Sequence, residues 1–304
     1  MKQIFLTLST LFAVLAYGQF DFALNSDGIR STWYNPASAG TYNTFTAQVQ
    51  ANRIKIFEGV FTNVINAEAS VKCLSFGKKE GAKLKGLGTV GIQFNLNDQD
   101  ILRSQAAKLV LNSQFQIKNT YLSIGISPGL QVLSLTDDWV FPTEPEVVNE
   151  TEGSIDAGLQ WFGKNFSVGI ATQRINEPSF TDLNFSTKRV LYAHAEYVFA
   201  IGENWNIRPR VAGRTADGFN TLEAMIFTNY ENLPLTVGVG LRNRESFIAG
   251  LYGRYSSFSL GYFTNIETSS FFGNRFGHEV RLSYALPDKN LNSVFDGDRG
   301  ILSF

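Results

Sequence analysis

The chain has 304 residues and a net charge of −1, because 26 lysines and arginines stand against 27 aspartates and glutamates. This balance gives no electrostatic case for nucleic acid binding, which favours a basic surface. The single cysteine, Cys73, excludes an intramolecular disulfide and a cysteine cluster for metal. The content of 26 phenylalanines and 27 glycines fits strands joined by tight turns.

The N-terminus has the pattern of a secretory signal peptide. It begins with Met1 and Lys2, continues as an apolar run over residues 4–15 and ends in a small-x-small pattern at Ala16-Tyr17-Gly18. This pattern predicts a cleaved segment over residues 1–18. The run is too short for a membrane helix, which needs about 20 residues. A buried N-terminal helix is the less well supported alternative.

Residues 19–42 should form a short N-terminal periplasmic segment. Asn35 and Pro36 begin a turn, and Gly40 permits a positive φ before the first strand. We expect this element at the periplasmic mouth of the protein or inside its lumen. It either positions the first strand or acts as a docking element, whose candidate residues are Tyr34, Asn35, Pro36, Ala37 and Gly40.

From residue 43 onward, apolar residues recur at every second position, which predicts β-strands. Fourteen strands are expected, at 43–52, 63–75, 86–97, 103–117, 119–133, 153–162, 165–174, 189–199, 204–214, 219–229, 233–243, 245–255, 257–266 and 275–286. An even count behind a signal peptide indicates an all-β fold, a transmembrane antiparallel β-barrel of the bacterial outer membrane over residues 43–286. A soluble β-sandwich is the alternative, but its strands are usually about 5–6 residues long.

The connections suggest an orientation. The longest predicted loops, 134–152, 175–188 and 267–274, follow odd-numbered strands, as outer loops of such barrels do. The long, lysine-rich connection 77–85 breaks this rule, and residues 287–304 should form a periplasmic tail. Aromatic residues favour interfaces, so four aromatics in the outer loops are candidate contacts. They are Trp139, Phe141, Phe271 and Phe272.

Alternation also sorts the charged residues. A charge facing lipid at the middle of the membrane costs about 2–4 kcal/mol, so charged positions should face the lumen. The expected lumenal charge network comprises Glu68, Lys72, Lys108, His194, Glu196, Arg208, Arg210, Arg214, Glu279 and Arg281.

The sequence offers little support for catalysis, a metal or a cofactor. His194 and Glu196 share a face with arginines, but no Gly-x-Ser-x-Gly element accompanies them. Two acidic pairs are present, Asp137 with Asp138 and Asp296 with Asp298. Each pair supplies too few oxygen ligands for calcium, which takes about 6–8. We therefore expect no enzyme and no cofactor, and a structural role for His278.

Several motifs together resemble one family. Tyr34-Asn35-Pro36-Ala37-Ser38-Ala39-Gly40 resembles the YNPAxAG signature of the PorP/SprF family. Asn176-Glu177-Pro178-Ser179-Phe180 is similar to its N-x-P-S-F loop, and 189–199 followed by 207–209 to a pair of its strands. His278-Glu279 and Leu282-Ser283-Tyr284 resemble its closing strand.

The resemblance implies an outer-membrane component of the type IX secretion and gliding machinery of Bacteroidetes. Such a protein supports export or surface anchoring of cargo proteins. Its expected partners are outer-membrane lipid, components of the secretion system, and secreted cargo or adhesin. A passive channel for small solutes is the alternative, because the sequence leaves an open or plugged lumen undecided.

Overall fold

The computed structural model describes residues 31–57, 60–76, 86–99, 102–135, 148–181, 185–202, 204–216, 219–230, 233–243, 246–269 and 273–288. Predicted features at 1–30 and 289–304 lie outside these ranges, as do Trp139, Phe141, Phe271 and Phe272. In the described part of the chain, no helix is long and apolar enough to cross a membrane.

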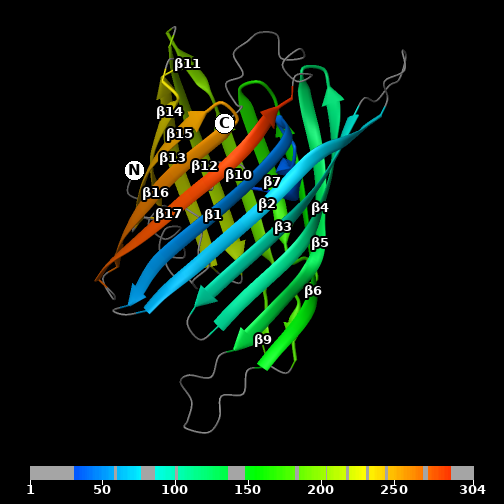
Figure 1. Cartoon of the computed structure of the whole chain (residues 1–304), viewed down its shortest axis with the longest axis vertical. Coiled ribbons are helices and arrows are strands. Elements are labelled where there is room, and N and C mark those ends of the chain that lie inside the picture. Colours follow the sequence, from blue (N-terminus) through cyan, green and yellow to red (C-terminus); the bar gives the residue numbers. More distant parts are fainter. Residues whose placement is uncertain are drawn as a thin grey trace, which may run out of the picture.

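The described chain forms a closed antiparallel barrel (Figure 1). Its first half comprises β1 (Asn43–Phe57), β2 (Val60–Phe76), β3 (Gly86–Gln99), β4 (Leu102–Ile117), β5 (Thr120–Leu135), β6 (Val148–Phe162) and β7 (Phe166–Gln173). The second half comprises β10 (Val190–Tyr197), β11 (Phe199–Ile201), β12 (Trp205–Ala216), β13 (Phe219–Tyr230), β14 (Leu235–Arg242), β15 (Ser246–Tyr255), β16 (Phe258–Ser269) and β17 (Gly273–Pro287). Pairing of β1 with β17 and of β10 with β12 closes the ring.

β10 and β11 are two parts of one strand, so the barrel has the fourteen strands predicted. Both pair with β12 in one register, in which Glu196 faces Arg210 and Phe199 faces Ile207. The break falls opposite Pro209, which lacks an N–H to donate to the ladder. On the other side of the strand the pairing with the β7 side continues, because the Val198 N–H donates to the carbonyl of Asn165 at 2.7 Å.

Several strands are longer than the alternation predicts, so the predicted outer-loop boundaries are wrong. β5 continues to Leu135 and β6 begins at Val148, which leaves only 136–147 of the loop 134–152. β16 and β17 leave only 270–272 of the loop 267–274, and residues 175–188 contain a hairpin of β8 (Ser179–Phe180) and β9 (Phe185–Ser186). The outward side chains beyond the apolar band are polar. The alternation of apolar and polar residues therefore ends before the backbone pairing of the strands does.

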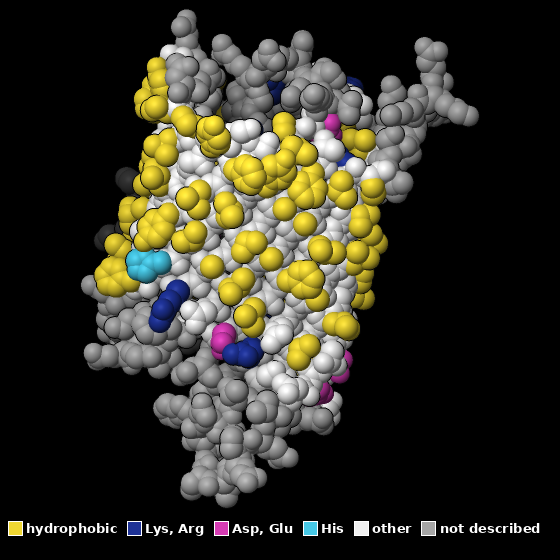
Figure 2. All heavy atoms as spheres, viewed as in Figure 1, with side chains coloured by type: hydrophobic (Ala, Val, Ile, Leu, Met, Phe, Trp, Pro, Cys, Tyr) yellow, Lys and Arg dark blue, Asp and Glu magenta, His cyan; other side chains and the backbone are white. Residues whose placement is uncertain are grey.

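The two faces of the barrel wall differ in polarity. Outward positions carry exposed apolar side chains such as Leu130, Leu241 and Leu260, and they form the band visible in Figure 2. Lumenal positions carry buried amides, and Gln50, Gln93 and Gln114 are 0% exposed. This is the arrangement of a membrane barrel, whose outer surface contacts lipid and whose interior is polar.

We name the end of the barrel where β1 begins and β17 ends the proximal end, and the opposite end the distal end. The segment 31–42 precedes β1 and lies within the lumen, where its single 3-10 turn, η1 (Pro36–Ser38), contacts β4, β5, β6 and β7.

Candidate functional site

The predicted docking motif lies inside the barrel as a compact turn. The Asn35 side chain caps η1, because its Oδ1 accepts a hydrogen bond from the N–H of Ala37 at 2.9 Å. Pro36 occupies the first position of the turn, where no N–H is needed. Gly40 has φ +63°, the conformation expected of a glycine before the first strand. The motif itself therefore supplies the cap, the proline and the positive-φ glycine of its turn.

Polar side chains of the wall hold the motif by its backbone. Asn112 on β4 donates to the carbonyls of Ala37 and Ala39 at 3.1 and 2.6 Å. Gln114 also donates to Ala39, and Ser123 on β5 donates to Ala37 at 2.6 Å. Buried carbonyls need such partners, because an unpaired one costs about 1–3 kcal/mol.

Three glycines on adjacent strands make room for the motif. Gly125 on β5 faces the backbone of Pro36 and Ala37, and Gly158 on β6 faces Oδ1 of Asn35; a β-carbon at either position would collide with these atoms. At Gly169 on β7, a β-carbon would lie 2.8 Å from Nδ2 of Asn35. We name Gly125, Gly158 and Gly169 the glycine cradle.

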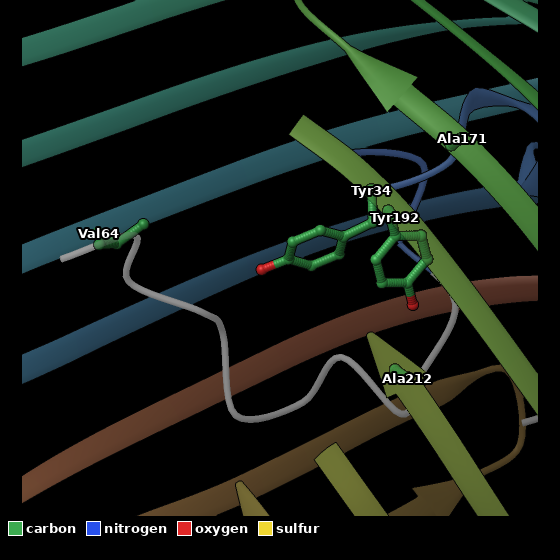
Figure 3. Close-up of a cluster of buried hydrophobic side chains, with 5 residues drawn as sticks. All are labelled: Tyr34, Val64, Ala171, Tyr192 and Ala212. Carbon is green, nitrogen blue, oxygen red and sulfur yellow. The ribbon is translucent and has the colours of Figure 1, made fainter. Parts of the chain in front are cut away.

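Tyr34 extends the contacts of the motif to β10 and β12. Its ring stacks on that of Tyr192 on β10, with centroids 5.4 Å apart, and the Arg214 guanidinium lies 5.1 Å from the Tyr34 centroid. Tyr34 and Tyr192 form a buried cluster with small side chains of the wall, shown in Figure 3. The other members are Val64, Ala171 and Ala212.

An ion-pair chain continues from this cluster along the wall. Arg210 on β12 donates to the Tyr192 hydroxyl at 2.6 Å and lies 3.6 Å from Glu223 on β13. Glu223 also pairs with Arg242 on β14 at 2.7 Å. Glu223 thus offsets part of the positive charge of Arg210 and Arg242.

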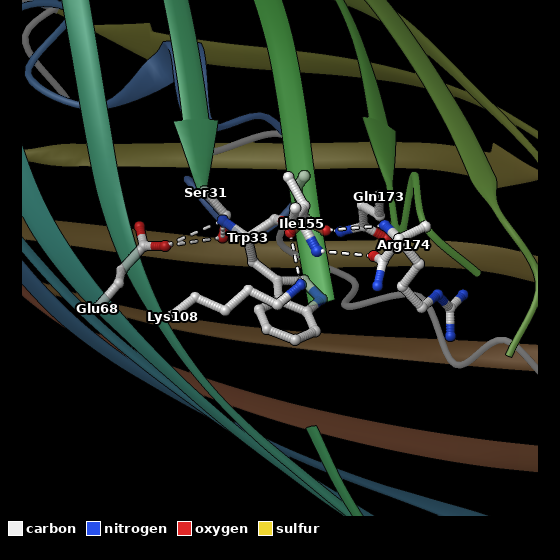
Figure 4. A network of polar contacts seen from close by, with 9 residues as sticks. Ser31, Trp33, Glu68, Lys108, Ile155, Gln173 and Arg174 are labelled. Carbon is white, nitrogen blue, oxygen red and sulfur yellow. Dashed lines mark hydrogen bonds and ion pairs between the residues drawn. The ribbon is translucent and has the colours of Figure 1, made fainter. Parts of the chain in front are cut away.

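A second network, shown in Figure 4, holds the start of the segment. Glu68 on β2 accepts hydrogen bonds from the hydroxyls of Ser31 and Thr32 at 3.1 and 2.6 Å, and from the N–H of Trp33. Gln173 on β7 donates to the carbonyl of Trp33. Segment 31–33 is therefore bound to two separate regions of the wall, on β2 and β7.

A buried ion pair lies beside this network. Nζ of Lys108 on β4 is 2.6 Å from Asp156 on β6, with both side chains almost fully buried, and 5.0 Å from the Trp33 ring centroid. Asp156 also accepts the N–H of Arg174 at 2.9 Å. The pair bridges β4 and β6 across β5.

The proximal mouth is packed with aromatic rings. Phe162 is 0% exposed and lies between Tyr42 and Tyr121, with centroids 5.1 and 5.5 Å away. Beside them Lys72 pairs with Asp288 at 2.6 Å, and the Asp288 N–H donates to the carbonyl of Tyr42. The residue after β17 is thus bound to the residue before β1.

The remaining predicted network residues face the lumen without meeting at one point. Glu279 accepts from Asn52 at 3.3 Å, and Arg281 donates to Gln48, which itself donates to Glu68. The Arg208 guanidinium lies 4.6 Å from the Phe227 ring centroid, Glu196 is buried, and His194 is half-buried. Among the described residues, no group of three His, Cys, Asp or Glu could hold a metal ion.

Sequence reasoning missed the partners that complete these networks, Asp156, Glu223 and Asp288, and the glycine cradle. Asp156 alternates in phase with lumenal Ser154 and Gln160, so the period-two pattern could have found it. The lumenal orientation of Glu223 could not be recognised from alternation, because lumenal Met225 and Phe227 make β13 apolar on both faces.

The sequence and the fold of the chain can be compared with those of known proteins. The family model described as type IX secretion system membrane protein PorP/SprF matches residues 31–284. The chain belongs to the PorP/SprF family. The matched range begins with the lumenal segment and includes all barrel strands up to Tyr284 in β17. Family and fold together place this PorP/SprF chain in the outer membrane.

Solved structures resemble this PorP/SprF chain in fold. The toluene transporter TbuX of Ralstonia pickettii has a TM-score of 0.52 at 9% identity, over 90% of this chain and 100% of its own. A deltaS2 mutant of the monoaromatic hydrocarbon channel TodX has a TM-score of 0.51 at 10% identity, over 90% of this chain and 99% of its own. At such identities the likeness shows the fold alone. Comparison with curated proteins finds no match.

Proposed function

We propose that this chain supports the export or surface anchoring of cargo proteins by the type IX secretion machinery, as a scaffold in the outer membrane and not as an enzyme. The observation that carries the proposal is the lumenal motif. Asn112, Gln114 and Ser123 bind its backbone, and the glycine cradle fits its shape. A barrel that binds a turn of its own chain in its interior is suited to presenting fixed surfaces at its two ends.

In this proposal the proximal end faces the periplasm. The N-terminal segment 19–42 and the tail 287–304 both connect to the barrel there, so machinery components would meet them at one end. The distal loops would face cargo or adhesin at the cell surface, with Trp139, Phe141, Phe271 and Phe272 as candidate contacts. Membrane lipid would surround the apolar band between the two ends.

A serine–histidine contact in the lumen supports packing better than hydrolysis. Ser167 Oγ lies 3.4 Å from Nε2 of His194 and accepts a hydrogen bond from Gln160 at 2.8 Å. Ser167 is 0% exposed. Beside it, a β-carbon on Gly169 would lie 2.5 Å from the His194 ring and 2.8 Å from Asn35. A nucleophile buried beneath the motif has no access for a lipid or protein substrate.

Affinity capture of the tagged full chain from native membranes tests the proposal. We expect other components of the secretion machinery or a secreted cargo protein to co-purify. A matched capture with a chain lacking residues 289–304 shows whether the tail contributes. Recovery of neither machinery nor cargo from membranes that contain both would contradict the proposal.

A passive channel remains the second candidate, favoured by the fold shared with a toluene transporter and a hydrocarbon channel. Conductance of the purified chain in planar bilayers separates the two functions. Our proposal predicts no steady current, because the motif and the packed aromatic rings occupy the lumen. A steady current, together with normal secretion in a strain that lacks the gene, would favour the channel.

A further inference from the structure

A polar cavity lies in the lumen, on the distal side of the family motif. It has a volume of about 90 Å³ and is enclosed by Trp33 and Tyr34 of the lumenal segment and by side chains of β2, β3, β4, β5 and β7. Its lining includes Asn97 near the distal end of β3 and Ser104 near the distal end of β4. A single water needs roughly 10–15 Å³, so this space holds several waters or a small polar ligand.

The cavity lining is positively charged. Lys108 on β4 and Arg174, which directly follows β7, both line the cavity, and its described lining residues include no aspartate or glutamate. Outside the lining, the Asp156 carboxylate lies 2.6 Å from Nζ of Lys108 and accepts the N–H of Arg174 at 2.9 Å. These two cations and one carboxylate have a net charge of +1. Figure 4 shows Lys108, Trp33 and Arg174 gathered in this region.

The backbone of Arg174 is held in place while its side chain keeps an unused donor. The residue has φ +53°, a conformation that few residues other than glycine adopt. Its N–H is bound by Asp156, and its carbonyl accepts the N–H of Glu177 at 3.0 Å. Nε of its guanidinium is buried and has no hydrogen-bond partner in the described part of the chain. A buried donor without an acceptor is unfavourable, so an acceptor on a ligand would stabilise it.

The amides and hydroxyl of the lining suit a ligand that carries hydroxyl groups. Asn95 and Asn97 on β3 and Gln131 on β5 line the cavity, and each amide offers both donors and an acceptor. Gln131 donates to Ser104 at 3.2 Å, whereas Oδ1 of Asn97 is buried with no hydrogen-bond partner among the described residues. A ligand hydroxyl can donate to such an oxygen and accept from an amide at the same time. The Trp33 ring adds an apolar surface for the body of the ligand.

The Arg174 donor and the Asn97 acceptor need complementary groups on one ligand. An anionic group serves Arg174 best, because guanidinium binds carboxylates and phosphates through charge-assisted hydrogen bonds. A neutral hydroxyl serves Asn97. We propose that the cavity binds an anionic sugar, with Arg174 holding its carboxylate or phosphate and Asn97 accepting a hydrogen bond from one of its hydroxyls. This site goes beyond the proposed function and does not depend on which end of the barrel faces the cell surface.

Equilibrium binding to the purified full chain in detergent tests the site, with glucuronate, glucose-6-phosphate, glucose and N-acetylglutamate as probes. At least one of the two anionic sugars should bind saturably, and the tighter of them identifies the acidic group. Glucose should bind at least about ten-fold more weakly, because it lacks the charged group. N-acetylglutamate has carboxylates without the sugar hydroxyls and should bind more weakly by a similar factor.

Substitutions at the cavity assign the two roles. Arg174→Gln should weaken binding of the anionic sugar at least about ten-fold, because charge-assisted hydrogen bonds are lost. Asn97→Ala should weaken it by about five-fold, since a neutral hydrogen bond contributes less. The matched control is Arg103→Gln, which removes an exposed cation that pairs with Asp98 at 2.9 Å on the outer face of the barrel. Binding in this variant should equal that of the wild type, and melting temperatures near the wild-type value show that the variants are folded.

Four results would overturn the proposal. They are no saturable binding of either anionic sugar, equal binding of glucose, full affinity in folded Arg174→Gln, and an equal loss in Arg103→Gln. N-acetylglutamate binding as tightly as the anionic sugars would also overturn it, because the ligand class would then be an acidic peptide. None of these measurements depends on cargo export, so failure here is distinct from failure of the proposed secretion function.

Discussion

Oδ1 of Asn35 lies against the backbone of Gly158 at the point where a β-carbon would collide with it. The two residues are far apart in sequence, and their contact places the family motif on the wall at β6. The same asparagine donates through Nδ2 to the carbonyl of Leu159 at 3.2 Å. One side chain thus caps the turn and attaches it to the barrel. Substitutions at this contact therefore test whether the wall holds the motif.

Gly158→Ala should destabilise the folded barrel by about 1–3 kcal/mol, because the added methyl overpacks the contact with Asn35. The apparent melting temperature in detergent measures the loss. Gly153→Ala is the matched control, because it adds the same methyl to the same strand with no atom within 4 Å of it. Equal melting temperatures for the two variants would show that the cradle does not hold the motif.

Asn35→Ala should cost about 0.5–2 kcal/mol through loss of the cap alone, with a further loss from the bond to Leu159. Asn35→Ser keeps a cap acceptor but removes the Nδ2 donor without adding a buried charge, so its unfolding free energy should lie between those of Asn35→Ala and the wild type. Denaturant unfolding of the three proteins provides the comparison. A serine variant less stable than the alanine variant would contradict the assigned roles.

Tyr34 and Tyr192 should be energetically coupled. A double-mutant cycle with leucine at each position should give a coupling energy of about 0.5–1.5 kcal/mol, the value for a stacked aromatic pair. Tyr34→Phe keeps the ring and should lose little of the coupling. If the two substitutions are additive, the stack contributes nothing to holding the motif.

Lys108→Met should destabilise the barrel by about 3–5 kcal/mol, because it leaves Asp156 buried without its cation. Adding Asp156→Leu should recover most of that loss, since both charges are then gone. Thermal unfolding of the single and double variants checks this order. A double variant less stable than Lys108→Met would contradict this prediction, because Asp156 would then stabilise the barrel even without its cation.

The sequence was sufficient for the fold class and the strand count, because outward apolar and lumenal polar residues alternate over most strands. It could not show that Gly125, Gly158 and Gly169 form a cradle. Their alignment depends on the registers of β5, β6 and β7, which alternation alone does not determine. The alternation also ended too early in β5 and β6, since these strands continue beyond the apolar band with polar side chains on their outward face.

The motif itself was recognisable from residues 34–40, but its position was not. From the sequence, a rigid turn with a proline could lie at the periplasmic mouth of the barrel or inside its lumen. The motif lies in the lumen because it binds side chains of other strands, among them Asn112 and Ser123. Nothing in the sequence distinguishes these residues from other lumenal polar residues. A turn can bind inside the lumen only where the wall supplies donors for its carbonyls, and that match exists only in three dimensions.

The most direct test of the central claim is the amount of type IX cargo at the cell surface and in the medium of a strain that lacks the gene. Our account predicts that at least one cargo protein is lost from the surface, and that the wild-type chain restores it. Unchanged amounts of every cargo protein, together with reduced uptake of a small solute, would contradict the account and identify the barrel as a channel.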